Sequence, residues 1–500
     1  MIASAAPMAT IETRAFIAGT FRHGAGAAVD SINPADGSVV ATLHHCTAED
    51  AQEAIAAGKA AAEAPAWRDM LPHNRARILH HIADGIEAQI AEIAALQTAD
   101  TGKTLAETGA LAQSASGTFR YVAAALETMD EALTTPRGPY LTMSIHEPIG
   151  VVAAINPWNS PIASDAQKIA PALAGGNAVV LKPAEWTPLV SLKLAQICAD
   201  AGLPAGLLSV LPGRGSVIGD VLVRHPDVGR IAFTGGTVTG RRVAAAAAVK
   251  FMPASLELGG KSPTIVFEDA DIEQAVAGVM YGVFSSTGQS CIAGSRLFVA
   301  RAIYDRFMAR LVECTQALRV GPGTDAATQV APMVHHSHRD SVAAHVAGAL
   351  ADGATLLCGG RAPEGPLYDK GAYYLPTILE GLPNSATICQ EEVFGPVLVA
   401  LPFEDEADLI AQANDSVFGL ACGLWTADYR RAWRFARAIK AGTVWINTYK
   451  QFSSSTPFGG VKDSGMGREK GRDWIRSYMH QKALYWGMDE APLAWAKTQA

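Results

Sequence analysis

The sequence predicts an α/β fold built from two doubly wound domains, and three observations support this interpretation. Short apolar runs such as 151–155 and 178–181 are typical of strands buried in a parallel sheet. These runs alternate with segments of helical periodicity, which is the pattern of a doubly wound sheet. The alternation restarts after 262–267, and the 500 residues exceed the roughly 250–300 at which a single core stops growing.

Local signals predict the elements that come before the first domain's sheet. Residues 1–45 have the pattern of short strands and turns. Thr47, with Asp50 three residues later, resembles the capped start of a helix, and an alanine-rich segment follows. We expect one further helix over 74–100 that ends at Gly102, because five isoleucines share one face. They are Ile78, Ile82, Ile86, Ile90 and Ile93.

Composition and charge argue against several classes of protein. The net charge is −8 and no run of Lys or Arg is present, so a nucleic-acid partner is not expected. No segment reaches the about 20 apolar residues of a membrane helix, and the N-terminus lacks a secretory signal. The seven cysteines are scattered without a Cys-x-x-Cys pair, which indicates free thiols in the cytoplasm and no metal site.

Cys291, Glu257 and Asn159 are the candidates for covalent chemistry. Cys291 lies in the Gly/Ser-rich segment 288–294, where small residues let backbone amides approach a reacting centre. Glu257 can activate the thiol or a water molecule, and Asn159, between two prolines, can hold a rigid amide toward an oxyanion. Taken singly, each has an ordinary alternative: a buried structural cysteine, a solvated carboxylate and a turn asparagine.

Signals for nucleotide binding are weaker but lie where sheets of this class bind ligands. Gly235 and Gly236 separate a strand from an alanine-rich helix, whose N-terminal amides can bind a phosphate. Lys182 and Glu185 follow another strand end, where a carboxylate can accept both ribose hydroxyls. The glycine run 213–219 is one residue too long for the dinucleotide fingerprint and is not counted as one.

These residues fall in seven motifs whose order and spacing resemble the aldehyde dehydrogenase superfamily across nearly the whole chain. The motifs are PWNSP (157–161), KPAE (182–185), FTGGT (233–237), LELGGKSP (256–263), GQSCIAGSR (288–296), EEVFGPV (391–397) and PFGGVKDSGMGRE (457–469). The resemblance implies an aldehyde dehydrogenase-like fold. It implies Cys291 as nucleophile, Glu257 as the base for water, Asn159 as an oxyanion donor and Lys168 as a proton-relay member.

The resemblance also implies the cofactor site and the domain division. The implied cofactor residues are Ile155, Trp158, Lys182, Glu185, Gly215, Phe233, Gly235, Gly236, Leu258, Glu392 and Phe394. NAD is expected rather than NADP, because Glu185 would repel a 2′-phosphate. The implied parts are an NAD-binding domain (1–127 and 149–258), a catalytic domain (259–462), and an oligomerisation arm with the C-terminal segment (128–148 and 463–500). A strand near 478–482 would extend a neighbouring subunit's sheet, so a homodimer or homotetramer is expected.

The expected substrate tunnel departs from the commonest family pattern because it is more polar. The candidate lining residues are Ser160, Ser164, Gln167, Ser290, Ile292, Lys450 and Phe452. The serines, glutamine and lysine favour a polar or anionic aldehyde such as a semialdehyde, although Lys450 could also be a solvated loop lysine. An aromatic box for a quaternary ammonium aldehyde is not evident.

The sequence therefore predicts oxidation of an aldehyde to a carboxylic acid through a thiohemiacetal and a thioester on Cys291. A cofactor-independent thiol esterase is an alternative, but no histidine has an evident catalytic position and the KPAE and FTGGT motifs would have no role. A non-catalytic structural member would not need Cys291, Glu257 and Asn159 together. A CoA-acylating enzyme would typically lack a base at the Glu257 position.

Overall fold

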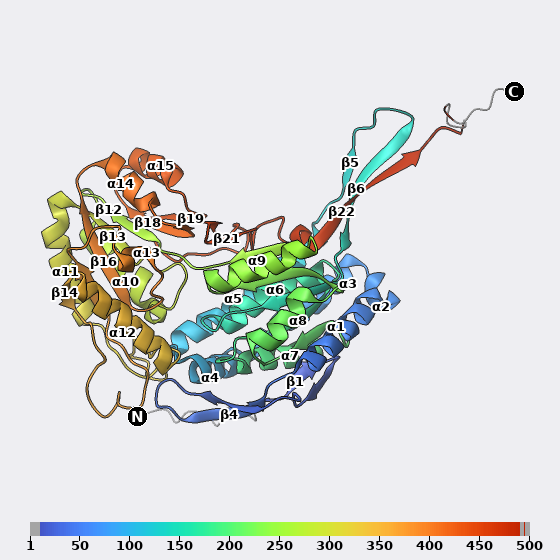
Figure 1. The fold of residues 1–500 in the computed structure, drawn as a ribbon. Helices are drawn as coiled ribbons and strands as arrows, with labels where there is room; N and C mark the ends of the chain where they lie inside the picture. Colours follow the sequence, from blue (N-terminus) through green and yellow to red (C-terminus); the bar gives the residue numbers. More distant parts are fainter. Residues whose placement is uncertain (1–10, 491–494, 496–500) are drawn as a thin grey trace.

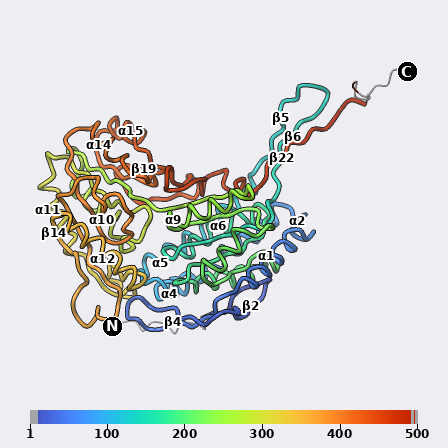
Figure 2. Tube along the Cα trace, viewed as in Figure 1, coloured from blue at the N-terminus to red at the C-terminus, as the bar shows by residue number. Residues whose placement is uncertain are grey.

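The computed structural model describes residues 11–490 and 495, and two sheets form its two lobes (Figure 1). The larger sheet has eight strands in the order β2-β1-β9-β8-β7-β10-β11-β21, and the smaller has seven in the order β14-β15-β16-β13-β12-β18-β19. Figure 2 shows the same lobes along the Cα trace, with a narrow arm that extends away from the larger lobe. The α/β, aldehyde dehydrogenase-like fold class predicted from the sequence is confirmed.

Short strands and a layer of helices precede the parallel part of the larger sheet. The strands are β1 (Ala15–Ile17), β2 (Thr20–Arg22), β3 (Ala28–Ile32) and β4 (Val39–His44). The helices are α1 (Ala48–Glu63), α2 (Pro65–Arg68), α3 (Pro72–Ala88), α4 (Ile90–Thr101) and α5 (Leu105–Glu127). The predicted cap of α1 is confirmed, because the Thr47 side chain accepts a hydrogen bond from the amide of Asp50.

The single helix expected over 74–100 is wrong, because the chain forms α3 and α4 there. Gln89 joins them with φ −120° and ψ 18°, outside the helical region. Its side-chain amide donates a hydrogen bond to the carbonyl oxygen of Gly85 at 3.0 Å. The predicted end is confirmed, since Gly102 adopts φ 80°, a left-handed conformation that glycine tolerates.

Parallel strands form the centre of the larger sheet. They are β7 (Val151–Ile155), β8 (Ala178–Lys182), β9 (Leu208–Val210), β10 (Val228–Thr234) and β11 (Ala254–Glu257). The connecting helices are α6 (Pro161–Ala174), α7 (Leu189–Asp200), η1 (Gly215–Gly219), α8 (Asp220–Arg224) and α9 (Thr237–Val249). The strand order reverses direction at β7, and ligands of such sheets bind beyond the carboxyl ends of the strands at this point.

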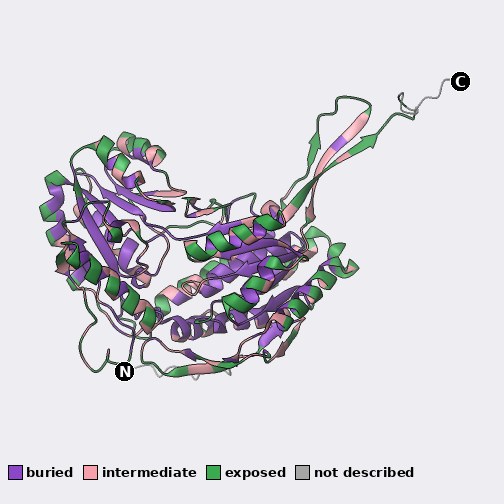
Figure 3. Ribbon diagram, in the orientation of Figure 1, coloured by how far each residue is buried: buried purple, intermediate pink, exposed green. Residues whose placement is uncertain are grey.

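The smaller sheet is parallel except at one edge. Its strands are β12 (Pro263–Val266), β13 (Arg296–Ala300), β14 (Thr355–Cys358), β15 (Thr377–Glu380), β16 (Val397–Phe403), β18 (Ala421–Trp425) and β19 (Thr443–Ile446), with β14 antiparallel to β15. The helical segments are α10 (Ile272–Phe284), η2 (Ser285–Gly288), η3 (Arg301–Ile303), α11 (Tyr304–Gln316), α12 (His336–Ala351), α13 (Thr387–Gln390), α14 (Glu406–Asn414) and α15 (Tyr429–Ala438). In both lobes the strands are buried and the outer helix faces are exposed (Figure 3).

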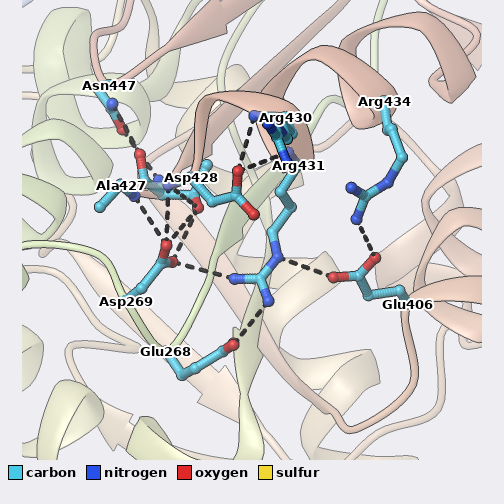
Figure 4. Close-up of polar contacts among 10 residues, drawn as sticks. Glu268, Asp269, Glu406, Ala427, Asp428, Arg430, Arg431, Arg434 and Asn447 are labelled. Atoms are coloured by element: carbon cyan, nitrogen blue, oxygen red, sulfur yellow. Dashed lines mark hydrogen bonds and ion pairs between the residues drawn. The ribbon is translucent and has the colours of Figure 1, made fainter.

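Arg431 fixes α15 to the strand ends of the smaller sheet. Its guanidinium forms ion pairs with Glu268 at 2.8 Å, Asp269 at 3.2 Å and Glu406 at 2.8 Å (Figure 4). It also lies 4.7 Å from the ring centroid of Phe267. Because this guanidinium is only partly exposed, the network is screened less than an ordinary surface ion pair and helps to hold the layers together.

A three-stranded arm is formed by β5 (Ala132–Thr134), β6 (Tyr140–Pro148) and β22 (Met479–Gly487), which η4 (Ile475–Tyr478) precedes. The arm exposes large apolar side chains, including Leu133, Tyr485 and Trp486. Three short strands complete the chain: β17 (Phe418–Gly419), β20 (Val461–Lys462) and β21 (Gly465–Met466), and β21 pairs with β11 in the larger sheet. Among the described residues, no helix has the length and apolarity to cross a membrane.

Candidate active site

Cys291 lies in a tightly turned segment between η2 and β13. Ser286 and Thr287 adopt left-handed φ values of 57° and 55°, and Gly288 has φ 69°. A Cβ added to Gly288 would overlap the carbonyl oxygen of Gly395, so the two segments approach as closely as backbone allows. The Cys291 side chain is half-buried at the end of this turn.

Two neighbouring glycines bring the thiol segment and a carboxylate together. A Cβ on Gly260 would overlap the carbonyl oxygen of Cys291, and a Cβ on Gly259 would overlap the carboxylate of Glu392. The amide of Gly260 donates a hydrogen bond to Oε1 of Glu392 at 3.0 Å. Since Glu257 ends β11 just before these glycines, the loop gathers Glu257, Cys291 and Glu392 in one region.

The thiol of Cys291 is protonated in this environment. Burial raises its pKa to about 12, and the nearby carboxylates of Glu392 and Glu257 act in the same direction, whereas Lys450 lowers it. Because the thiolate is the nucleophilic form, a base must remove this proton before attack. The chain therefore does not present a permanently activated thiolate.

Asn159 reaches the same segment from the larger sheet. It follows β7, and its side-chain amide donates a hydrogen bond to the carbonyl oxygen of Gln289 at 3.0 Å. The Gln289 side chain in turn accepts a hydrogen bond from the amide of Val334 at 2.9 Å. The predicted proximity of Asn159 to the thiol segment is thus present, and a rigid amide donor lies two residues from Cys291.

Three charged side chains form a buried group behind the thiol. The amino group of Lys168 forms an ion pair with Glu469 at 2.8 Å and donates a hydrogen bond to Thr234 at 2.7 Å. Glu257 is 5% exposed, and neither of its carboxylate oxygens has a hydrogen-bond partner within the described ranges. Burial raises the pKa of Glu257 well above its usual value, and the negative charge of Glu469 raises it further, while Lys168 lowers it.

Glu469 was not among the residues singled out from the sequence. It ends the PFGGVKDSGMGRE motif, and the sequence signal that could have found it is an acidic residue after a glycine-rich loop. In the fold, Glu469 is 3% exposed. Only the three-dimensional pairing with Lys168 from α6 shows why this carboxylate is tolerated, because a buried charge needs a partner.

The polar residues expected to bind a cofactor lie beyond the carboxyl ends of the larger sheet. Lys182, which ends β8, donates to the carbonyl oxygens of Pro183 at 2.7 Å and Gly213 at 3.2 Å. Burial lowers its pKa to about 8. Oε1 of Glu185 accepts a hydrogen bond from the amide of Gly215 at 2.9 Å, which fixes that carboxylate at the mouth of the sheet.

The region where a phosphate is expected has room for one. A Cβ on Gly236, at the N-cap of α9, would meet no atom within 4 Å, so there is open space beside this helix N-terminus. Gly235 instead packs against the ring of Phe233. This set of an open helix start, a fixed carboxylate and a buried lysine fits the phosphate and ribose of a dinucleotide.

Aromatic side chains surround the other end of the expected cofactor site. The ring of Trp158 lies 5.2 Å from that of Phe394 and 5.3 Å from that of His338. His338, which the sequence reasoning missed, hydrogen-bonds the carbonyl oxygen of Phe394 at 2.8 Å, and Phe394 has a left-handed φ of 55°. The remaining cofactor candidates, Ile155, Phe233 and Leu258, are buried apolar residues.

The residues expected to contact substrate have free polar groups. Within the described part of the chain, the side chains of Ser160, Ser164 and Gln167 form no hydrogen bond, and Ser160 is the N-cap residue of α6 without capping it through its side chain. Ser290 precedes Cys291 and is half-buried. The carbonyl of Ile292 accepts a hydrogen bond from the hydroxyl of Tyr449 at 3.0 Å.

Two further substrate candidates lie in the loop after β19. The amino group of Lys450 donates a hydrogen bond to Ser285 at 2.7 Å, so Lys450 is not a freely solvated lysine. Phe452 is 49% exposed, and its ring lies 5.6 Å from that of Trp445. The amino group of Lys470 lies 4.3 Å from the Phe452 ring centroid.

Comparison with known proteins identifies the family. Residues 21–484 match the Aldehyde dehydrogenase family. Betaine aldehyde dehydrogenase 1 of Rhizobium meliloti is 43% identical over 482 residues, which cover 95% of this chain and 98% of the relative. A betaine aldehyde dehydrogenase of Cereibacter sphaeroides is 45% identical over 464 residues, 93% of this chain and 94% of its own.

Solved structures agree. The crystal structure of betaine aldehyde dehydrogenase from Staphylococcus aureus in complex with NAD+ superposes with a TM-score of 0.96 at 36% identity, and covers 98% of this chain and 97% of its own. The fold and a thiol site of this kind define an oxidoreductase acting on a carbonyl. The chain belongs to the aldehyde dehydrogenase family, and the prediction of an aldehyde-oxidising enzyme is confirmed.

Proposed function

We propose that this chain oxidises its aldehyde on Cys291, with Asn159, Glu257 and the Lys168–Glu469 pair acting around that thiol and NAD as cofactor. The observation that carries the proposal is that Gly259 and Gly260, which follow Glu257 closely in the chain, contact the Glu392 carboxylate and the backbone of Cys291. The NAD+ complex of the Staphylococcus aureus relative supports the choice of cofactor.

The first half of the reaction forms a covalent intermediate. The sulfur of Cys291 bonds to the carbonyl carbon after the thiol proton passes to a water molecule, because burial raises the pKa of the thiol and the neutral form must be deprotonated before attack. The side-chain amide of Asn159 and the backbone amide of Cys291 stabilise the oxyanion of the thiohemiacetal. NAD, when bound, accepts the hydride that converts the thiohemiacetal into a thioester.

The second half releases the acid. Glu257 takes a proton from a water molecule, whose oxygen attacks the thioester carbon and displaces the Cys291 thiolate. Because Glu257 has no hydrogen-bond partner among the described residues, its carboxylate is free to turn toward that water. The buried Lys168–Glu469 pair provides a polar route by which the proton leaves Glu257.

The cofactor contacts follow from the larger sheet and the facing loop. Glu185 and Lys182 would hold the adenosine ribose, and the helix N-terminus at Gly236 would hold the pyrophosphate. Glu392 would hold the nicotinamide ribose, and Trp158 and Phe394 would hold the nicotinamide ring. The fixed charge of Glu185 favours NAD over NADP.

The substrate is a polar or anionic aldehyde. The free side chains of Ser160, Ser164 and Gln167 can pair with polar groups, and an alkyl chain would leave them unsatisfied. The relatives quoted above are named for betaine aldehyde, which is a cation. A tunnel that holds Lys450 is poorly suited to a cationic substrate.

The arm supports an oligomer, because β22 is an edge strand of its sheet and the arm exposes the apolar side chains of Leu133, Tyr485 and Trp486. We place the enzyme in the cytoplasm on its free thiols. We also propose the domain division expected from the sequence. It has an NAD-binding domain (1–127 and 149–258), a catalytic domain (259–462), and an oligomerisation arm with the C-terminal segment (128–148 and 463–500).

The mechanism is tested by Cys291→Ala, with NADH formation and NAD binding measured in parallel. Loss of NADH formation with NAD affinity near that of the wild type is expected, because the thiol does not hold the cofactor. Substantial turnover by the variant would overturn covalent catalysis at Cys291. A variant that also loses NAD binding is compared with Cys291→Ser, which keeps the size of the side chain.

A further inference from the structure

Two lysines in the region of the thiol segment, Lys103 and Lys450, have no carboxylate partner among the described residues. Lys103 lies between α4 and α5 and is 3% exposed, and Lys450 is half-buried in the loop after β19. The polar contact of the Lys450 amino group is the hydroxyl of Ser285 at 2.7 Å, and a ring, that of Tyr281, lies at 5.8 Å. Neither lysine forms an ion pair with any carboxylate in residues 11–490 or with residue 495. Unpaired buried charge is costly, so proteins keep it where a ligand completes the pair.

The backbone holds Lys450 beside the thiol. The residue before it, Tyr449, donates a hydrogen bond from its hydroxyl to Ile292, the residue after Cys291, at 3.0 Å. Lys450 itself has a left-handed φ of 54°, which turns the chain sharply at this point. Its contact with Ser285 ties it to the start of the turn that ends at Cys291. Lys450 is thus joined to both sides of the Cys291 segment.

Lys103 is held against the same segment from the other lobe. A Cβ on Gly323 would overlap the carbonyl oxygen of Lys103, and the amide of Leu105 donates to the carbonyl of Gly323 at 2.9 Å. Two residues further, Glu107 accepts a hydrogen bond from the amide of Ser286 at 2.6 Å. This clamp fixes the 103–107 segment next to the turn that leads to Cys291.

The charges in this region do not cancel. Glu107 is the one carboxylate that acts on both lysines, and its two oxygens accept hydrogen bonds from the amides of Ser286 and Thr104, at 2.6 Å and 3.1 Å. Those bonds direct the carboxylate toward backbone rather than toward the amino groups. Two lysine side chains therefore share the influence of one carboxylate that backbone amides already engage.

The pKa shifts of Lys450 and Lys103 are those of buried amines that lack a neutralising partner. Burial lowers its pKa to about 7, and the positive charge of Lys103 lowers it further, while Glu107 and Cys291 raise it. Burial likewise lowers the pKa of Lys103. A bound anion would raise both, because an opposite charge nearby favours the charged form of an amine.

We propose that Lys103 and Lys450 form a carboxylate subsite, and that the substrate is an aldehyde with a carboxylate at its far end, the semialdehyde of a dicarboxylic acid. The inference rests on the proposed function, since the aldehyde end must reach Cys291. The two amino groups donate charge-assisted hydrogen bonds to the two carboxylate oxygens, which orients the chain with its aldehyde toward the thiol. The same charges repel a quaternary ammonium substrate.

The first test uses the wild-type enzyme with succinic semialdehyde, butanal of equal chain length, and betaine aldehyde. We expect kcat/KM for the semialdehyde to exceed that for butanal at least about ten-fold, and betaine aldehyde to be the poorest of the three. The advantage over butanal should shrink as the pH rises through about 7, where Lys450 loses its proton. Equal kcat/KM for the semialdehyde and butanal at every pH would overturn the proposal.

The second test uses Lys103→Met and Lys450→Met, which keep the length of the side chain, and Lys440→Met as a control at an exposed lysine. Each of the first two should lower the ratio of kcat/KM for succinic semialdehyde to kcat/KM for butanal about ten-fold or more, whereas Lys440→Met should leave this ratio unchanged. Lys450→Arg should restore most of the preference. The proposal is wrong if the Met variants affect both aldehydes alike. Failure to form NADH from any aldehyde would instead refute the proposed function.

Discussion

The amino group of Lys168 and the carboxylate of Glu469 lie 2.8 Å apart with both side chains almost fully buried, 301 residues apart in sequence. The pair lies next to Glu257, whose pKa rises because of burial and then because of the charge of Glu469. The protonation of the proposed base therefore depends on residues from α6 and from the loop before η4. Four substitutions test this geometry and the residues next to it.

Glu469→Gln should move the acidic limb of the pH–rate profile to lower pH. Removing the negative charge takes away a cause that raises the pKa of Glu257, and the unpaired Lys168 lowers it further, so Glu257 stays ionised at lower pH. Glu469→Asp keeps the charge and should shift the limb less. A profile of steady-state kcat against pH measures this, and an upward shift in Glu469→Gln would contradict the coupling.

Lys168→Met should destabilise the fold, because it leaves Glu469 as an unpaired buried charge. Breaking a buried pair from one side costs about 3–5 kcal/mol, which denaturant unfolding monitored by fluorescence can measure. The matched control is Lys59→Met, which removes an exposed lysine from its pair with Asp227 and should cost far less, because water screens an exposed pair. A comparable loss of unfolding free energy in the two variants would mean that the buried pair contributes no more to stability than the exposed pair.

Glu257→Gln should slow release of the acid more than formation of the thioester. The amide can no longer take a proton from water, while the thiol segment and Asn159 are unchanged. Rapid mixing with NAD and aldehyde should give a burst of NADH equal to the active sites, followed by slow turnover. Full steady-state turnover would remove Glu257 from the role of base.

Gly459→Ala should impair the enzyme through the base. An added Cβ would lie 2.8 Å from Oε1 of Glu257, and Gly459 has φ 154°, which side chains rarely adopt. We expect a loss of stability of about 1–3 kcal/mol and a slower release of the acid. Gly117→Ala is the control, because the added Cβ meets no atom within 4 Å and lies on an exposed helix position. Equal behaviour of the two variants would contradict the tight contact.

Cofactor choice gives a further test at Glu185. Its carboxylate is held by the amide of Gly215 at 2.9 Å, so its charge stays near the expected ribose 2′ position. Glu185→Ser removes the repulsion of a 2′-phosphate and should raise the NADP/NAD ratio of kcat/KM about ten-fold. Glu185→Asp keeps the charge and serves as the control. A wild-type enzyme that prefers NADP would contradict this assignment.

The sequence by itself determined the fold class and the family, and it supplied most of the residues proposed for the site. Buried parallel strands are short apolar runs that local composition reveals, which is why 151–155 and 178–181 were recognised. Cys291, Glu257 and Asn159 were identified because they lie in compact motifs of fixed spacing. The caps at Thr47 and Gly102 were also predictable, because their signals act within a few residues.

The tertiary structure decided what depends on contacts between distant segments. The break at Gln89 lies in a stretch whose isoleucine period continues across it, so no local pattern marks it. Glu469 and His338 join the site only because the chain returns to it, and neither has a sequence signal of its own. Likewise, Lys103 and Lys450 lie far apart in sequence. The charge of Lys103 lowers the pKa of Lys450 because both side chains are buried, where the local dielectric constant is low.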